Sequence, residues 1–314
     1  MYEIFYGLKE KPFEITPDPD FFFASENHKE GLANLKYAIK EGKSFTVLTG
    51  EVGSGKTILI RKLLNQLNGV ARTTYIFNPI MNRSDFLEFI CRDLGVEVPE
   101  GLSDGKLVSA LHEFLLQCYE RREKVFLIID EAQAMDPDLL DLVRMLTNLE
   151  TSKSKLLNVI LMGQPELTDI LNTDRFRPLK QRVTVRFDLK PLTREETAEY
   201  ILYRIKRARS RDLRIFDKGS IDEIFRYSKG IPRLINVICD NALLTGFARG
   251  AKRLNKGVIR DVIRELDVSN KPKSENRAKL HPAMAFLAAA VVIMAIVWGY
   301  HSGILKILGE MIHG

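Results

Sequence analysis

The sequence predicts an α/β protein in which a five-stranded parallel sheet is followed by a small all-helical lid and a C-terminal transmembrane helix. Three observations support this order. Short apolar runs alternate with longer helical patterns between residues 44 and 191, helical patterns alone follow over 192–268, and an uncharged apolar run covers 283–300. Alternation of the first kind is typical of βαβ units, whose strands lie parallel in one doubly wound sheet.

The composition indicates a globular chain with a mild basic bias. Its 314 residues, 45% of them hydrophobic, can form a core domain and one smaller module. Lys and Arg outnumber Asp and Glu by 47 to 41, which favours phosphate, nucleic acid or anionic lipid as partners. The cysteines are scattered, and the N-terminus lacks a basic segment followed by an apolar run. We therefore expect buried thiols, no zinc site, no cleaved signal peptide and a cytoplasmic main domain.

Five strands are expected from short runs rich in β-branched and aromatic residues. They cover residues 45–49, 73–77, 125–129, 157–162 and 183–187. The sheet domain is assigned to residues 44–191, and residues 1–43 precede it.

A glycine-rich loop directly follows the first expected strand and precedes a helical pattern, as the pattern GxxxxGK[ST] requires. The glycines let backbone N–H groups surround phosphates, and the helix N-terminus adds its positive dipole end. Lys56 is expected to neutralise the β- and γ-phosphates of ATP, and the Thr57 hydroxyl to bind Mg²⁺. The expected nucleotide-binding residues are Gly50, Glu51, Val52, Gly53, Ser54, Gly55, Lys56 and Thr57.

Two carboxylates end the third expected strand. Asp130 suits Mg²⁺ coordination, directly or through water, and Glu131 suits polarising the water that attacks ATP. A core strand followed by a helix-capping acid would look the same, but the glycine-rich loop earlier in the chain favours the ATPase interpretation. Gln164 follows the fourth strand. It can contact the γ-phosphate or the water if that strand lies between the two motif strands, or it can simply bond to backbone.

The lid is expected to open with a capping box from Thr193 to Glu196 and to continue with helices over 218–228, 232–249 and 255–266. Residues 269–282 are polar, basic and interrupted by two prolines, which is typical of a linker.

The apolar run 283–300 has roughly 18 residues, near the minimum for a bilayer span, although a buried helix of a soluble domain is the alternative. Basic residues precede it, and Trp298 and Tyr300 end it. This pattern predicts a single-pass inner-membrane protein with a cytoplasmic ATPase domain and with anionic lipid near the basic linker.

The sequence resembles the AAA+ superfamily and, within it, the ExeA/GspA-type ATPases of bacterial secretion and pilus assembly. The resemblance covers about residues 1–266. It is carried by YGLKEKPFEITPDPDFFFASENHKEGLANLKYAI, VLTGEVGSGKT, FLIIDEAQ, LMGQPEL, LKQRV and KGIPRLIN, in that order. It implies a P-loop AAA+ domain over 44–191, a lid over 192–268, and an N-terminal adenine-side segment over 1–43 in which 23–28 closes over the base.

The resemblance also implies roles for individual residues. Gln164 lies at the sensor 1 position, and Arg233 looks like the sensor 2 arginine that reaches from the lid to the γ-phosphate, although it could instead cap or bridge a lid helix. Arg182 looks like an arginine finger, for which Arg175 and Arg177 are competing candidates. ATP, Mg²⁺, a homo-oligomeric ring and an inner-membrane envelope-assembly partner are implied with them.

The first functional hypothesis is therefore a membrane-anchored AAA+ ATPase that supports assembly of an envelope secretion, pilus or polysaccharide-export machine. The alternative is a DNA-associated transposition-helper or replication-initiator-like ATPase, with the basic stretch 204–214 on phosphates. A scaffold that binds nucleotide without hydrolysing it is disfavoured by Glu131. Many family members carry a periplasmic peptidoglycan-binding domain beyond the membrane helix. The tail 301–314 is too short for such a domain, so we expect a partner protein to bind the peptidoglycan.

Overall fold

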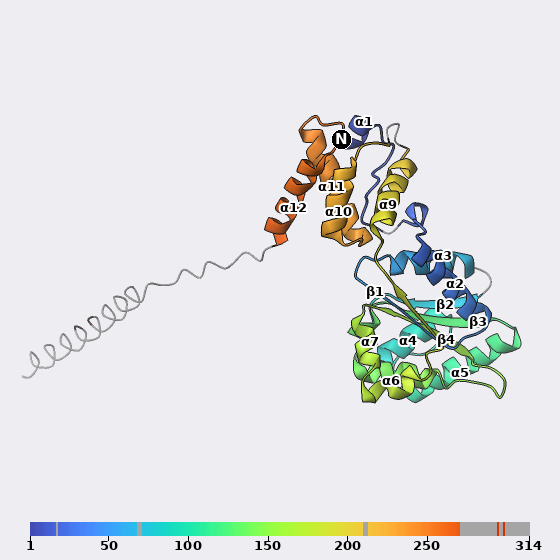
Figure 1. Cartoon of the computed structure of the whole chain (residues 1–314). Coiled ribbons are helices and arrows are strands. Elements are labelled where there is room, and N and C mark those ends of the chain that lie inside the picture. Colours follow the sequence, from blue (N-terminus) through green and yellow to red (C-terminus); the bar gives the residue numbers. More distant parts are fainter. Residues whose placement is uncertain (17, 68–70, 210–212, 271–293, 295–297, 299–314) are drawn as a thin grey trace, which may run out of the picture. The chain divides into compact units, whose positions relative to one another are not determined.

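The structure is a computed structural model that describes residues 1–270 apart from 17, 68–70 and 210–212, together with Met294 and Trp298 (Figure 1). The chain divides into one compact unit from Met1 to Arg264 and a second from Glu265 to Gly314. Nearly all of the predicted linker 269–282 and spanning helix 283–300, and the whole tail 301–314, lie outside the described residues. Among the residues that are described, no helix has the length and apolar character needed to cross a membrane.

The first unit contains the expected five-stranded parallel sheet, in the order β2-β3-β4-β1-β5. β4 lies between β1 and β3, as the hypothesis for Gln164 requires. β5 starts at Val185 instead of residue 183, because Val183 N–H closes a turn onto the Lys180 carbonyl. The strands are β1 Phe45–Gly50, β2 Ala71–Ile76, β3 Lys124–Ile129, β4 Leu157–Gly163 and β5 Val185–Leu189.

Helices cover both faces of the sheet, which explains why the strands read as continuous apolar runs. In β3, Leu127 and Ile129 face one hydrophobic core, whereas Phe126 and Ile128 face the other. The second core is closed by α2 Glu26–Lys40 and α3 Lys56–Leu67. The first is closed by α4 Arg83–Asp93, α5 Asp104–Glu120, α6 Pro137–Leu146, α7 Glu166–Leu171, α8 Arg177–Lys180 and the 3-10 helices η2 Ala132–Ala134 and η3 Asp174–Phe176.

The helical lid follows the sheet, as predicted. α9 begins with the expected capping box, in which Thr193 and Glu196 each bond to the other's backbone N–H. α12 runs to Asn270, beyond the expected end at residue 266. The lid helices are α9 Arg194–Arg207, α10 Lys218–Ser228, α11 Pro232–Ala248 and α12 Lys256–Asn270.

The N-terminal segment, expected to lie on the adenine side throughout 1–43, instead divides between two neighbours. Helix α1 Tyr2–Tyr6 packs on α11 (Figure 1), and Tyr6 Oη donates to the Ala251 carbonyl at 2.9 Å. Phe13 is fully buried. The later part approaches the glycine-rich loop: residues 14–16 and 18 line one cavity that borders the loop, and residues from the 3-10 helix η1 Pro19–Phe21 to the start of α2 line another. The adenine-side assignment of 1–43 stays a prediction, while α1 itself packs on the lid, where Tyr2 and Tyr6 are buried.

Candidate active site

A cavity of about 480 Å³ opens beside the glycine-rich loop. The parallel sheet brings the ends of β1 and β3 to the same edge, so residues far apart in sequence meet there. The lid contributes the start of α11, and the N-terminal segment contributes residues 14–16 and 18. The expected site residues that line this cavity are Val52, Gly53, Gly55, Lys56, Thr57, Asp130, Glu131 and Arg233.

The glycines of the loop are required by close approach as well as by backbone conformation. Gly53 and Gly55 have φ values of +80° and +104°, which side-chain-bearing residues rarely adopt. A Cβ on Gly53 would lie 2.4 Å from Cβ of Arg233, and one on Gly55 would lie 2.9 Å from Nε2 of His28. Residues without side chains are therefore needed at the two positions where the lid and α2 contact the loop.

Lys56 is the first residue of α3 and is 5% exposed. Its Nζ donates to the carbonyl oxygens of Gly50 at 2.7 Å and Glu51 at 3.1 Å. Burial lowers the pKa of this ammonium group, while the nearby Glu131 and Asp130 carboxylates act in the opposite direction. A buried cation at a helix N-terminus is an arrangement that attracts phosphate.

Asp130 is 1% exposed, and both of its carboxylate oxygens accept hydrogen bonds. Its Oδ2 accepts from Thr57 Oγ1 at 3.2 Å and from Tyr75 Oη at 2.8 Å, while Oδ1 accepts from Glu131 N–H at 2.9 Å. Burial, and then the Asp130 charge, raise the pKa of Tyr75 well above its usual range. The adjacent hydroxyl and carboxylate oxygens of Thr57 and Asp130 are the hard donors that Mg²⁺ prefers, so these residues fit the ion.

Glu131 adopts a left-handed backbone conformation, φ +50° and ψ +37°, where β3 turns into η2. Its Oε2 accepts from Gln133 Nε2 at 2.6 Å and from Gln164 Nε2 at 3.1 Å. Gln164 therefore contacts the expected base and does not bond only to backbone. The sequence did not predict a role for Gln133 or Tyr75 at this site, although Gln133 belongs to the segment FLIIDEAQ.

Arg233 stands at the start of α11, where its backbone N–H donates to the Gly53 carbonyl at 3.2 Å. This bond ties the lid to the glycine-rich loop. Because Arg233 also lines the cavity, its position suits the expected contact with the γ-phosphate.

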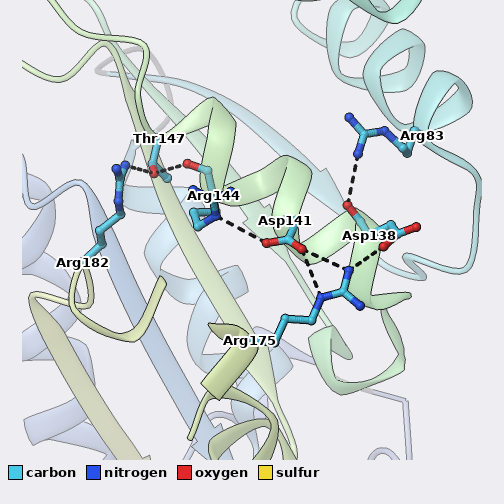
Figure 2. Close-up of polar contacts among 7 residues, drawn as sticks. All are labelled: Arg83, Asp138, Asp141, Arg144, Thr147, Arg175 and Arg182. Carbon is cyan, nitrogen blue, oxygen red and sulfur yellow. Dashed lines mark hydrogen bonds and ion pairs between the residues drawn. The ribbon is translucent and has the colours of Figure 1, made fainter. Parts of the chain in front are cut away.

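The three arginine-finger candidates do not line this cavity. Figure 2 shows Arg182 and Arg175 at different ends of α6. Arg182 Nη1 donates to Thr147 Oγ1 at 2.8 Å, whereas Arg175 bonds to the carboxylates of Asp138 and Asp141. Arg177 is exposed at the start of α8. None of the three therefore reaches the nucleotide site of its own chain.

The segment expected to close over adenine, 23–28, reaches the loop through His28, which is 4% exposed. His28 Nε2 lies 3.2 Å from the Ser54 carbonyl oxygen, and Nδ1 lies 2.7 Å from Ser25 Oγ. The carbonyl can only accept, so Nε2 carries the proton and Nδ1 accepts from the Ser25 hydroxyl. Burial lowers the pKa of this imidazole.

The glycine-rich loop after β1, the acidic end of β3 and the helical lid together define a P-loop ATPase fold of the AAA+ class. Residues 39–171 match the AAA domain family. The chain belongs to the AAA+ ATPases.

Within that superfamily the chain is of the ExeA/GspA type. It is 40% identical over 259 residues to General secretion pathway protein A of Aeromonas hydrophila, which covers 82% of this chain and 47% of that protein. The chain thus spans about half the length of this relative.

Two solved structures share the fold. Cdc6p from Pyrobaculum aerophilum has a TM-score of 0.62 and 19% identity, over 81% of this chain and 74% of that one. The ORC2 protein of Aeropyrum pernix has a TM-score of 0.63 and 15% identity, over 85% and 74% respectively. At these identities the likeness concerns the fold alone.

Proposed function

We propose that this chain is a membrane-anchored AAA+ ATPase that hydrolyses Mg-ATP to support assembly of an envelope secretion, pilus or polysaccharide-export machine. One observation carries the proposal. Lys56, Asp130 and Glu131 converge on one cavity in a chain that is 40% identical to a general secretion pathway protein.

In this mechanism the loop N–H groups and Lys56 would hold the phosphates, and Thr57 and Asp130 would hold Mg²⁺. The ion, when bound, neutralises charge on the phosphate oxygens. Glu131 orients a water molecule and takes its proton while the water oxygen bonds to the γ-phosphorus. The bond between that phosphorus and the bridging oxygen breaks, which releases ADP and phosphate. Arg233 contacts the γ-phosphate from the lid, so the lid can respond to whether that phosphate is present.

Two substitutions test the chemistry in the purified full-length protein. Lys56→Ala removes the buried cation of the loop, so ATP binding should weaken by an order of magnitude or more. Glu131→Gln keeps the shape but not the base, so Mg-ATP should bind normally while turnover falls at least about 100-fold. Glu113→Gln, exposed on α5, is the matched control. A Glu131→Gln protein with wild-type turnover would remove Glu131 from the role of base.

The membrane part of the proposal rests on the sequence of the basic linker and of 283–300. We expect the full-length protein in the inner-membrane fraction, with the ATPase domain cytoplasmic and residue 314 accessible from the periplasm. A truncation after residue 268 should be soluble. Recovery of the full-length chain entirely in the soluble fraction would contradict the anchor. Binding of the linker to anionic but not neutral vesicles would support the expected lipid contact.

The DNA-associated alternative draws on the fold shared with Cdc6p and ORC2 and on the basic stretch 204–214. Part of that stretch is engaged within the chain. Arg204 is 6% exposed, donates to the Pro12 and Glu14 carbonyls and lies over the Phe21 ring. Arg207 pairs with Asp20 at 3.5 Å. The prediction that Arg204 would contact phosphates was therefore wrong, because the N-terminal segment buries it. Salt-dependent binding to duplex DNA at physiological ionic strength would revive this alternative.

A further inference from the structure

A second glutamine lies beside the proposed base. Gln133 is half-buried in η2, two residues after Glu131. Its Nε2 donates to Glu131 Oε2 at 2.6 Å, and its Oε1 accepts from the backbone N–H of Gln164 at 3.0 Å. Because Gln164 Nε2 donates to the same carboxylate oxygen at 3.1 Å, the three residues close a ring of hydrogen bonds.

The chemistry of the groups fixes the orientation of both amides. A backbone N–H can only donate, so the Gln133 oxygen must face Gln164. This turns the Gln133 NH₂ group toward the Glu131 carboxylate, which can only accept. Gln164 must present its NH₂ group to the carboxylate for the same reason. A flipped amide would lose its bond and oppose like dipoles, so the ring has one satisfied arrangement.

The end of β4 is shaped to admit the Gln133 side chain. A Cβ placed on Gly163 would lie 2.7 Å from Gln133 Oε1 and 2.9 Å from Cδ2 of Leu167. Any larger residue at 163 would therefore displace the glutamine or α7. η2 also packs directly against β4. Gln133 thus connects the turn that carries Glu131 to the strand that carries Gln164.

The ring engages one side of the carboxylate. In the part of the chain that the structure describes, both side-chain bonds to Glu131 end on Oε2. Two N–H donors on one oxygen hold the plane of the carboxylate and leave Oε1 as the oxygen for water.

We propose that Gln133 is a positioning residue that, together with Gln164, clamps Oε2 of Glu131 and so aims Oε1 at the attacking water. The inference rests on the proposed ATP hydrolysis and deepens it. Gln133 acts through Glu131 and is not among the residues that line the nucleotide cavity. Its loss should lower kcat and leave nucleotide binding intact.

Three variants of the full-length protein test the clamp. Gln133→Met keeps the length but neither hydrogen bond, and kcat should fall about 10-fold or more, since a bond to a charged group is lost. Gln133→Glu keeps an acceptor for Gln164 N–H but sets a second carboxylate against Glu131, and kcat should fall further. KM and the Kd of a fluorescent Mg-ATP analogue should change less than about threefold in both. Gln117→Met, exposed on α5, is the control.

The decisive measurement is a double-mutant cycle in single-turnover hydrolysis. In a Glu131→Gln background the clamp has no base to aim, so adding Gln133→Met should leave the residual rate unchanged within about twofold. If the role of Gln133 is purely structural, Gln133→Met should lower the single-turnover rate by the same factor in the wild-type and Glu131→Gln backgrounds. It should also raise KM and lower thermal stability together. That result overturns the proposal.

Failure of the clamp and failure of the ATPase proposal are distinguishable. If the wild-type protein hydrolyses ATP and Gln133→Met matches it, only the clamp is wrong. If the wild type binds Mg-ATP but does not hydrolyse it under any condition of assembly, the proposed function itself fails, and with it the role of Gln133.

Discussion

Arg182 is expected to act on the nucleotide of a neighbouring subunit, which the structure makes testable through Thr147. Arg182 does not line the nucleotide cavity of its own chain, and it donates to Thr147 Oγ1 at 2.8 Å. Because Thr147 is the C-cap of α6, this bond could equally well serve the fold. Arg182→Ala and Thr147→Val separate the two roles. The first removes the guanidinium, whereas the second keeps it and removes its resting partner, together with the bond from the Thr147 hydroxyl to the Arg144 carbonyl.

The magnitudes favour release of Arg182 during turnover. The hydrogen bond from the charged Arg182 guanidinium to the Thr147 hydroxyl contributes about 1.5–3 kcal/mol. An arginine finger contributes about 10³-fold or more in rate, which is roughly 4 kcal/mol. Arg175 would instead have to leave two carboxylates, Asp138 and Asp141. Arg182→Ala should therefore keep nucleotide binding and lose most turnover, whereas Thr147→Val should retain at least about half of it.

The assay is turnover per subunit across a range of protein concentration, followed by mixing. A finger acting between subunits makes turnover rise faster than linearly with concentration. Mixing Arg182→Ala with Glu131→Gln should restore part of the activity, because some interfaces then pair an intact finger with an intact base. If turnover per subunit does not change with protein concentration, and Arg182→Ala has normal activity, Arg182 is not a finger that acts between subunits. Equal losses in Arg182→Ala and Thr147→Val would make the bond structural and pass the role to exposed Arg177.

Three further predictions follow from the site. Tyr75→Phe removes a half-buried donor to Asp130, so the Mg²⁺ concentration for half-maximal turnover should rise about 10-fold, as for other lost partners of metal ligands; an unchanged Mg²⁺ dependence would contradict this. His28 has a pKa below its unfolded value of about 6.5, so the unfolded chain binds more protons as the pH falls. Stability should then decrease by up to about 1.4 kcal/mol per unit below pH 6.5, and His28→Gln should abolish that part of the slope in thermal melts. Gly53→Ala would force a Cβ to 2.4 Å from Arg233, so nucleotide affinity should fall at least about 10-fold in titrations.

The sequence predicts those parts of the fold and site that depend on local pattern. Continuous apolar runs identify the strands because each strand is covered on both faces, and a capping box marks the start of α9. Lys56, Thr57 and Asp130 could be placed together because their motifs follow strands that end at one edge of the sheet. The role of Gln164 depended on β4 lying between β1 and β3, and the observed order satisfies that condition.

Contacts between distant segments were not predictable from such patterns. Tyr75 reaches Asp130 because β2 pairs with β3, and a tyrosine in a strand reads equally well as core. Arg204 gives the clearest example, since a charged run normally marks a solvated helix face. Its guanidinium instead supplies the donors that the Pro12 and Glu14 carbonyls need once the N-terminal segment is packed against α9. Arg204→Lys cannot supply the same fork of donors, so it should loosen the N-terminal segment and the nucleotide cavity that residues 14–16 line, although the charge is kept.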